Sequence, residues 1–327
     1  MAMTHKILKG IGLLILLVVI IYGVLRAAAW VHSPSSHYPG EYLSVNSKQV
    51  RYVCSGDGAP LIFFESGFGS GSDETWKSLS EKLSQTNRVC YYDRLGYGGS
   101  DDIAPDFSTD DKSMVQQAIL THVAADQPVI VVGHSYGGIL ARRTLHRALN
   151  NTGEVANLNI AGLILVDSAH ENQHEILRGK LDPIPAEVEQ KAYWTAWFGV
   201  DDILAMFRPG VEEGEVDSSA YYVSLRWAHV LSTYVREKGN YTPLDEFDYD
   251  FGDLPMIVLS HDDKAYEGNP RFEGVGPLWT ALQEELAALS DNSEIRVVEG
   301  ATHDIPADAP SAVIQAVEDM LIKVAPE

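Results

Sequence analysis

Short apolar segments alternate with amphipathic segments along most of the chain. The apolar segments are rich in β-branched and aromatic residues and are bounded by polar or turn-forming residues, which is typical of β-strands. Most are apolar at successive positions rather than at alternate ones, and this pattern favours a parallel sheet that is covered on both faces. The predicted strands are residues 49–54, 61–66, 88–93, 128–133, 161–167, 255–260 and 294–300.

Helical patterns lie between these strands, and the chain of 327 residues, 45% of them hydrophobic, is long enough to bury a full core. The alternation predicts an α/β fold with helices on both faces of a mostly parallel, doubly wound sheet. The predicted helices run from Glu74 to Ser84, Asp111 to Ala125, Gly138 to Asn150, Pro277 to Leu289 and Pro310 to Val324.

The alternation stops between about residues 171 and 251. This stretch is acidic and rich in Trp and Tyr, and the strand pattern resumes only after Pro255. We interpret it as a helical cap inserted into one α/β domain that spans residues 36–327.

The first 35 residues differ from the rest. Lys6 and Lys9 precede an uncharged run from Ile11 to Leu25, and Arg26 follows it. The run is at the upper limit for a signal-peptide core and slightly shorter than the roughly 20 residues of a spanning helix. We favour an uncleaved membrane anchor with a cytoplasmic N-terminus, and a cleaved signal peptide is the alternative. Both place the rest of the chain outside the cytoplasm.

Charge and cysteine content exclude two classes of protein. All 46 acidic residues lie beyond residue 35, and the formal net charge of the whole chain is −22, which argues against nucleic acid as a partner. Cys54 and Cys90 are the only cysteines, too few for a disulfide-built scaffold. An oxidising compartment would still permit one bridge between them.

The segment GHSYGG, residues 133–138, follows a predicted strand and precedes a predicted helix. In that context the pattern G-x-S-x-G is typical of a nucleophile elbow. The turn is sharp enough to strain the serine backbone, and side chains two positions away on either side would collide, which explains Gly133 and Gly137. The elbow raises the hydroxyl of Ser135 above the sheet edge, beside the N-terminus of the next helix. We therefore predict that Ser135 is a nucleophile.

A serine hydroxyl needs a base, usually a histidine that a carboxylate holds. His303, in the segment ATHDIP, is the best placed of the eleven histidines because it follows the last predicted strand. His134 is held inside the elbow, and His122 and His146 lie in helical patterns. We predict that His303 is the base.

Five segments, ESGFGS, YDRLGYGGSD, GHSYGG, LILVDSAH and ATHDIP, occur in this order, and together they resemble the α/β-hydrolase superfamily from about residue 40 to 325. The resemblance implies that Ser135 is the nucleophile, that His303 is the base and that no cofactor is needed. It also implies an oxyanion hole formed by the backbone N–H groups of Phe68 and Tyr136. Many members have His-Gly where this chain has Ser66-Gly67, but a hole of backbone groups tolerates that change.

The resemblance leaves the acid open. The family usually places it after the strand that follows the cap, often as G-x-x-D, but this chain lacks the glycine there and carries Asp262 and Asp263 out of register. Some relatives, including haloalkane dehalogenases, carry the acid one strand earlier, where this chain has Asp167. We favour Asp167, with Asp262 or Asp263 as the alternative acid.

The resemblance also bears on the two cysteines. In this fold the strands that hold Cys54 and Cys90 are neighbours in the sheet. A bridge between them is therefore geometrically conceivable.

The segment HENQH, residues 170–174, matches the zinc motif H-E-x-x-H. A zinc site would need both histidines on one helix face, a third ligand and an open position, but the motif begins three residues after a strand, where a helix has barely started. His229 or His261 as the third ligand has no support in the spacing. We therefore predict no metal site, and we expect His170 and His174 at the entrance of the cap.

Together these features predict a serine hydrolase that cleaves an ester or a similar acyl compound of low molecular mass. One alternative is an amide or peptide hydrolase of the aminopeptidase type, in which carboxylates of the cap would bind a free amine. Another is a noncatalytic, membrane-anchored protein that binds a ligand under the cap. The candidate carboxylates are Glu187, Glu189, Asp201, Asp202, Glu212, Glu213, Glu215 and Asp217.

Overall fold

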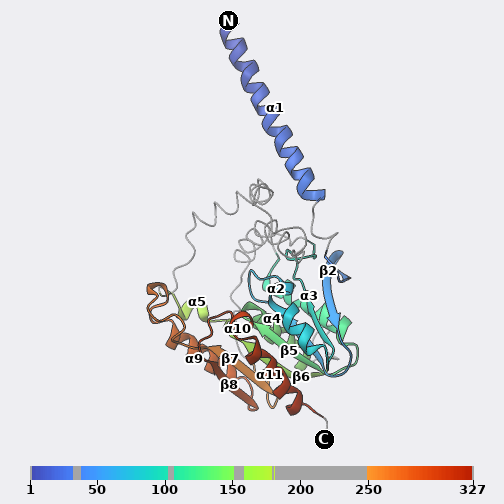
Figure 1. Cartoon of the computed structure of the whole chain (residues 1–327), viewed down its shortest axis with the longest axis vertical. Coiled ribbons are helices and arrows are strands. Elements are labelled where there is room, and N and C mark those ends of the chain that lie inside the picture. The colour runs from blue at the N-terminus through green and yellow to red at the C-terminus, as the bar shows by residue number, and fades with distance from the viewer. Residues whose placement is uncertain are drawn as a thin grey trace.

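The computed structural model of the chain describes residues 2–31, 38–101, 107–150, 158–178, 180 and 249–325. Within these residues eight strands form one sheet in the order β1-β2-β4-β3-β5-β6-β7-β8 (Figure 1). Neighbouring strands are parallel from β4 to β8, and β1 and β2 are antiparallel to their neighbours. The sheet is thus mostly parallel, as the sequence predicts.

Seven of these strands lie where the apolar segments predict them, and the first was not predicted. β1 pairs with β2 through a tight turn at Asn46 and Ser47, both of which have positive φ. It is an edge strand that exposes much of its surface, so it lacks the continuous apolar pattern of the buried strands. The strands are β1 Glu41–Val45, β2 Lys48–Ser55, β3 Leu61–Glu65, β4 Val89–Tyr92, β5 Val129–His134, β6 Ile160–Val166, β7 Met256–His261 and β8 Ser293–Val298.

The five predicted helices are present with shifted ends. α4 begins two residues earlier than predicted because Ser135 itself occupies the N-cap position. Three shorter elements were not predicted: α5 Gln173–Ile176, the 3₁₀ turn η3 Pro270–Phe272 and α10 Ile305–Asp308. The longer helices are α1 Ala2–Val31, α2 Ser72–Leu83, α3 Thr109–Ala124, α4 Tyr136–Leu149, α9 Gly276–Ala287 and α11 Pro310–Lys323.

Side chains on successive residues of the central strands enter two different cores. Val131 and Leu165 pack on one face with residues of α3 and α4, whereas Val132 and Val166 pack on the other with residues of α2 and α11. Because both faces are covered, the strands are apolar at every position. The carboxyl ends of these parallel strands meet at one edge of the sheet, and the candidate catalytic residues lie there.

Helix α1 contains a 20-residue stretch, His5–Val24, whose mean hydropathy is 2.7 and of which no part is buried. The stretch is long and apolar enough to cross a membrane, a property that a signal sequence near the N-terminus shares. The predicted cap at about residues 171–251 lies almost entirely outside the described residues and stays a prediction.

The two cysteines are joined. Cys54 in β2 and Cys90 in β4 are direct partners across the antiparallel strand pair, and their sulfurs form a disulfide. The strands are neighbours, as the family resemblance implied, and the bond ties the antiparallel edge of the sheet to its parallel part.

Breaking this disulfide is expected to destabilise the domain. The bond closes a loop with a sequence separation of 36 residues, and a loop of that size restricts the unfolded chain enough to stabilise the fold by about 2–4 kcal/mol. Urea unfolding of the Cys54→Ala/Cys90→Ala double variant should show a loss of that size. Thiol titration of the unfolded, unreduced wild type should find no free thiol, and two free thiols would contradict the bond.

Candidate active site

Ser135 lies between β5 and α4 in a strained backbone conformation. Its φ and ψ are 52° and −122°, a region that costs a non-glycine residue about 1–3 kcal/mol. Its backbone N–H donates to the carbonyl of Val166 at 3.0 Å, which ties the elbow to β6. The residue is partly exposed, as a nucleophile must be.

The glycines beside Ser135 are required by close backbone contacts. A Cβ atom on Gly133 would lie 2.8 Å from the Cα of Gly138, and one on Gly137 would lie 2.6 Å from the carbonyl oxygens of Glu65 and Ser66. Real Cβ atoms essentially never approach backbone atoms this closely. The structure therefore agrees with the steric reason that the sequence gives for the G-x-S-x-G spacing.

His303 lies in the loop between β8 and α10 and faces Ser135. Its Nε2 is 2.8 Å from the Ser135 Oγ. Two bonds hold its backbone, because its N–H donates to the Tyr266 hydroxyl at 2.8 Å and its carbonyl lies 2.9 Å from the Nε2 of His134. Burial and the neighbouring His303 lower the pKa of His134 to about 4, so His134 is uncharged at neutral pH and its Nε2–H donates this bond.

Asp167 follows β6 and is fully buried, with a positive φ of 42°. One carboxylate oxygen, Oδ2, is 2.5 Å from the Nδ1 of His303. The other, Oδ1, accepts bonds at 2.9 Å from the indole N–H of Trp279 and from the backbone N–H of His261. Burial raises the pKa of Asp167, but the bonds from His261 and His303 outweigh it and hold that pKa far below its usual range. The carboxylate is therefore ionised.

The pKa of His303 reflects this arrangement. Burial lowers it, whereas the hydrogen bond to Asp167 and the charge of Asp167 raise it, and the net pKa is raised. A proton taken up at Nε2 is thus stabilised by the carboxylate on the opposite side of the ring.

The two alternative acids lie elsewhere. The Asp262 carboxylate accepts bonds from the backbone N–H groups of Lys264 at 3.0 Å and Gly300 at 3.4 Å, and Asp263 is exposed. Of the three aspartates that the sequence nominates, the structure brings Asp167 to the His303 ring.

The start of the HENQH segment is engaged in structural contacts. Glu171 forms a fully buried ion pair with Arg142 at 2.8 Å, so its carboxylate is already committed. His170 accepts a bond from the backbone N–H of Asn172 at its Nδ1, and its Nε2 lies 3.2 Å from the Glu285 carboxylate. His174 is exposed in α5. These contacts stabilise the chain just after β6. The segment does not have the geometry of a zinc-binding H-E-x-x-H motif.

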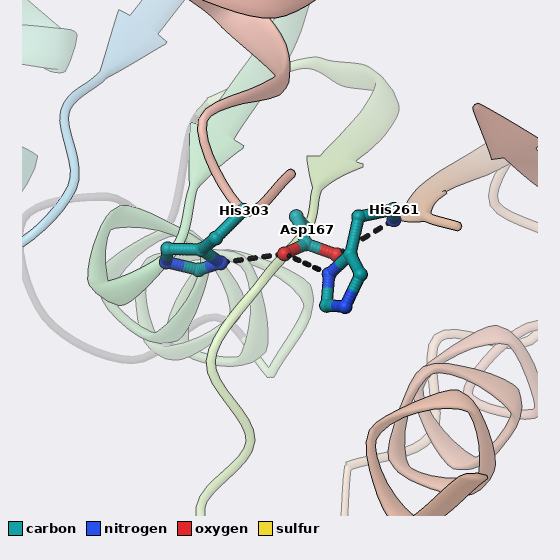
Figure 2. A group of neighbouring side chains, drawn as sticks. All are labelled: Asp167, His261 and His303. Atoms are coloured by element: carbon teal, nitrogen blue, oxygen red, sulfur yellow. Dashed lines mark hydrogen bonds and ion pairs between the residues drawn. The ribbon is translucent and has the colours of Figure 1, made fainter. Parts of the chain in front are cut away.

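Asp167, His261 and His303 offer ligand atoms within 4.8 Å of one another and are therefore a candidate metal site. Both Nδ1 atoms approach the same carboxylate oxygen, at 2.5 Å and 2.8 Å (Figure 2). In a tetrahedral zinc site the ligand atoms would stand about 3.3 Å apart. The arrangement fits hydrogen bonds better than metal coordination.

The loop after β3 lies against the elbow, where an added Cβ on Gly67 would lie 3.2 Å from the Cβ of Ser135. Arg94 donates to the carbonyls of Ser66 at 2.5 Å and Gly67 at 2.7 Å and pairs with Glu65. Since C=O and N–H point in opposite directions in a trans peptide, the Phe68 N–H points away from Arg94. The Phe68 ring also meets the Tyr136 ring edge-on at 5.3 Å, so the two residues of the predicted oxyanion hole are in contact.

Comparison with known proteins identifies the family. A family model described as the alpha/beta hydrolase family matches residues 61–316. The chain belongs to the alpha/beta hydrolase family. The structure of a probable hydrolytic enzyme from Pseudomonas aeruginosa resembles that of this alpha/beta hydrolase with a TM-score of 0.61 and 16% identity, over 87% of this chain and 95% of that chain. The predicted superfamily and fold are confirmed.

Two relatives of this alpha/beta hydrolase show differing substrates. A 2-hydroxy-6-oxo-6-(2'-aminophenyl)hexa-2,4-dienoic acid hydrolase from Metapseudomonas resinovorans is 25% identical over 233 residues, 70% of this chain and 77% of that protein. A proline iminopeptidase from Pestalotiopsis fici is 23% identical over 148 residues, 45% of this chain and 52% of that protein. Both relatives support the assignment of this chain to the hydrolases.

Sequence reasoning missed the residues around the acid. His261 stands in the segment where the family usually has its acid, and the missing G-x-x-D pattern was the one available signal. Trp279 and Tyr266 carry no motif, because their side chains reach Asp167 and His303 only through the folding of α9 and of the loop after β7.

Proposed function

We propose that the protein is a serine hydrolase that cleaves an ester or a related acyl compound of low molecular mass. The observation that carries the proposal is the continuous hydrogen-bonded series from Ser135 Oγ through the His303 ring to the buried Asp167 carboxylate. A strained serine, a base within 2.8 Å and an ionised acid are the parts that acyl transfer needs.

In the proposed reaction, His303 Nε2 removes the hydroxyl proton as Ser135 Oγ attacks the carbonyl carbon. The oxyanion accepts hydrogen bonds from the N–H groups of Phe68 and Tyr136. The protonated His303 then gives its proton to the leaving oxygen, and an alcohol departs from the acyl-enzyme. Water, deprotonated by His303, releases the carboxylic acid and restores the serine. Asp167 stays ionised throughout and stabilises the imidazolium.

Amide or peptide hydrolysis is the second candidate, and the similarity to the proline iminopeptidase favours it. The same three residues would perform it, with an amine as the leaving group. The cap carboxylates that could bind a free amine lie outside the described residues.

A substrate panel on the full chain in detergent separates these candidates. We expect turnover of p-nitrophenyl acetate and butyrate to exceed that of aminoacyl p-nitroanilides by at least about 10-fold in kcat/KM. A 2-hydroxy-6-oxo-hexadienoic acid serves as a third arm because of the dienoic acid hydrolase relative. Preference for the anilide would favour the aminopeptidase type. Failure of a fluorophosphonate probe to label the protein would instead favour a noncatalytic binding protein.

We further propose that α1 anchors the enzyme in a membrane and that the catalytic domain lies outside the cytoplasm. The apolar stretch His5–Val24 and the basic residues Lys6 and Lys9 at its N-terminal end support this orientation. The disulfide between Cys54 and Cys90 also favours an oxidising compartment.

A further inference from the structure

A second histidine binds the carboxylate that His303 uses. His261, the last residue of β7, is 5% exposed, and its Nδ1 lies 2.8 Å from Asp167 Oδ2. Figure 2 shows the carboxylate between the two imidazole rings, with the bonds from His261 on one side and that from His303 on the other. The backbone N–H of His261 also donates to Oδ1 at 2.9 Å.

Aromatic neighbours hold the His261 ring in this position. It stacks on Trp279 with centroids 5.8 Å apart and meets the ring of Tyr266 edge-on at 5.4 Å. Both neighbours also contact the candidate triad, because Trp279 donates to Asp167 and Tyr266 accepts from the backbone of His303. The same two side chains thus fix the His261 ring and contact the candidate triad.

The hydrogen bonds define where the protons lie. An ionised carboxylate oxygen only accepts, so Nδ1 must carry a proton on both His261 and His303. The two donors therefore share one oxygen, Asp167 Oδ2. Each bond neutralises part of the carboxylate charge, and the portion that His261 neutralises is not available to His303.

We propose that His261 is a positioning residue for the triad, a second donor that holds Asp167 in place and moderates its attraction for the protonated His303 ring. The inference rests on the proposed function, since it assigns His303 the role of base. The usual family acid is absent from the end of β7, where this chain has His261. Asp167, the candidate acid, follows the neighbouring strand β6 instead.

The sign of the expected effect follows from this sharing. Without the His261 donor, Asp167 presents more charge to His303, so the pKa of His303 should rise and the acidic limb of the pH–rate profile should move to higher pH. If His261 only filled space, a side chain of similar size should leave the pKa of His303 unchanged. A smaller side chain should then let Asp167 shift away, and the pKa of His303 should fall. The other ionisable groups that face His303, namely His134, Asp304 and Tyr266, are the same in both cases.

The experiment compares three His261 variants in the full chain in detergent. His261→Phe keeps an aromatic ring without the donor, and His261→Leu removes the donor with a smaller apolar side chain in case Phe cannot be accommodated. His261→Asn keeps an N–H at the position of Nδ1. The titration of His303 is followed by NMR of protein labelled with ¹⁵N-histidine and assigned with His303→Gln. We expect Phe or Leu to raise the pKa of His303 by about 0.5–1 unit and Asn to leave it near the wild-type value.

His146→Phe is the matched control, because His146 lies near the far end of α4 and contacts Asn150 and Tyr249 rather than the triad. It should not alter the titration of His303. A pKa of His303 that is unchanged or lower in both His261→Phe and His261→Leu would overturn the proposal, as would an Asn variant that behaves like Phe. Ester turnover is measured in parallel, so a wild type that fails to hydrolyse esters defeats the proposed function while the titration still decides the role of His261.

Discussion

Replacing Ser135 by Ala is expected to lower kcat for p-nitrophenyl acetate by on the order of 10⁶-fold. Alanine keeps the elbow backbone but removes the only atom that His303 is placed to activate, the Oγ at 2.8 Å from its Nε2. Loss of a serine nucleophile costs nearly as much as loss of a whole triad, because the remaining residues act only through it. Initial rates and labelling by a fluorophosphonate probe both measure this.

The matched control is Ser78→Ala, since Ser78 is an exposed serine of α2. It should keep the wild-type rate and full labelling. Ser135→Ala protein that still turned over the ester at more than about one hundredth of the wild-type rate would contradict the mechanism. Thermal unfolding of both variants checks that the fold is intact.

The elbow could be predicted from the sequence because its geometry is local. Gly133, Ser135 and Gly137 lie within five residues, and a side chain on Gly133 would collide with Gly137 and Gly138 of the same segment. Gly137 is required by a less local contact, because its added Cβ would meet the carbonyls of Glu65 and Ser66. The base could also be predicted, since the end of the last strand of such a sheet leads to the edge where the elbow stands.

The choice between the candidate acids depends on packing between segments that are distant in the sequence. Asp167 and Asp262 both follow parallel strands that are neighbours in the sheet, so a pattern of strands cannot distinguish them. The distinction comes from a buried pocket of donors around Asp167, supplied by His261 and by Trp279 of α9. Those contacts join residues about one hundred positions apart, and no local signal marks them. The exposed edge strand β1 was missed for the opposite reason, because little of it is buried.

Replacing Asp167 by Asn is expected to lower kcat for the same ester by about 10⁴-fold. An amide carries no charge to stabilise the protonated His303, and its NH₂ group can favour the wrong tautomer by donating to Nδ1, which places the remaining proton on Nε2, where Ser135 needs a base. The buried donors of His261 and Trp279 would also face an uncharged group. The loss should appear in kcat more than in KM, because the charge matters in the transition state.

Asp262→Asn is the matched control, and we expect it to change kcat less than about twofold. Its carboxylate bonds to the backbone N–H groups of Lys264 and Gly300, and among the described residues it makes no hydrogen bond to His303. A chelator should leave the wild-type rate unchanged, since the proposed steps use protein groups alone. If Asp262→Asn caused the larger loss, Asp262, which follows β7, would be assigned as the acid. If instead Asp167→Asn kept activity and a chelator abolished it, the zinc interpretation of HENQH would return. A large loss in Asp167→Asn together with no effect of a chelator would assign Asp167 as the acid that orients His303, because no other described carboxylate contacts that ring.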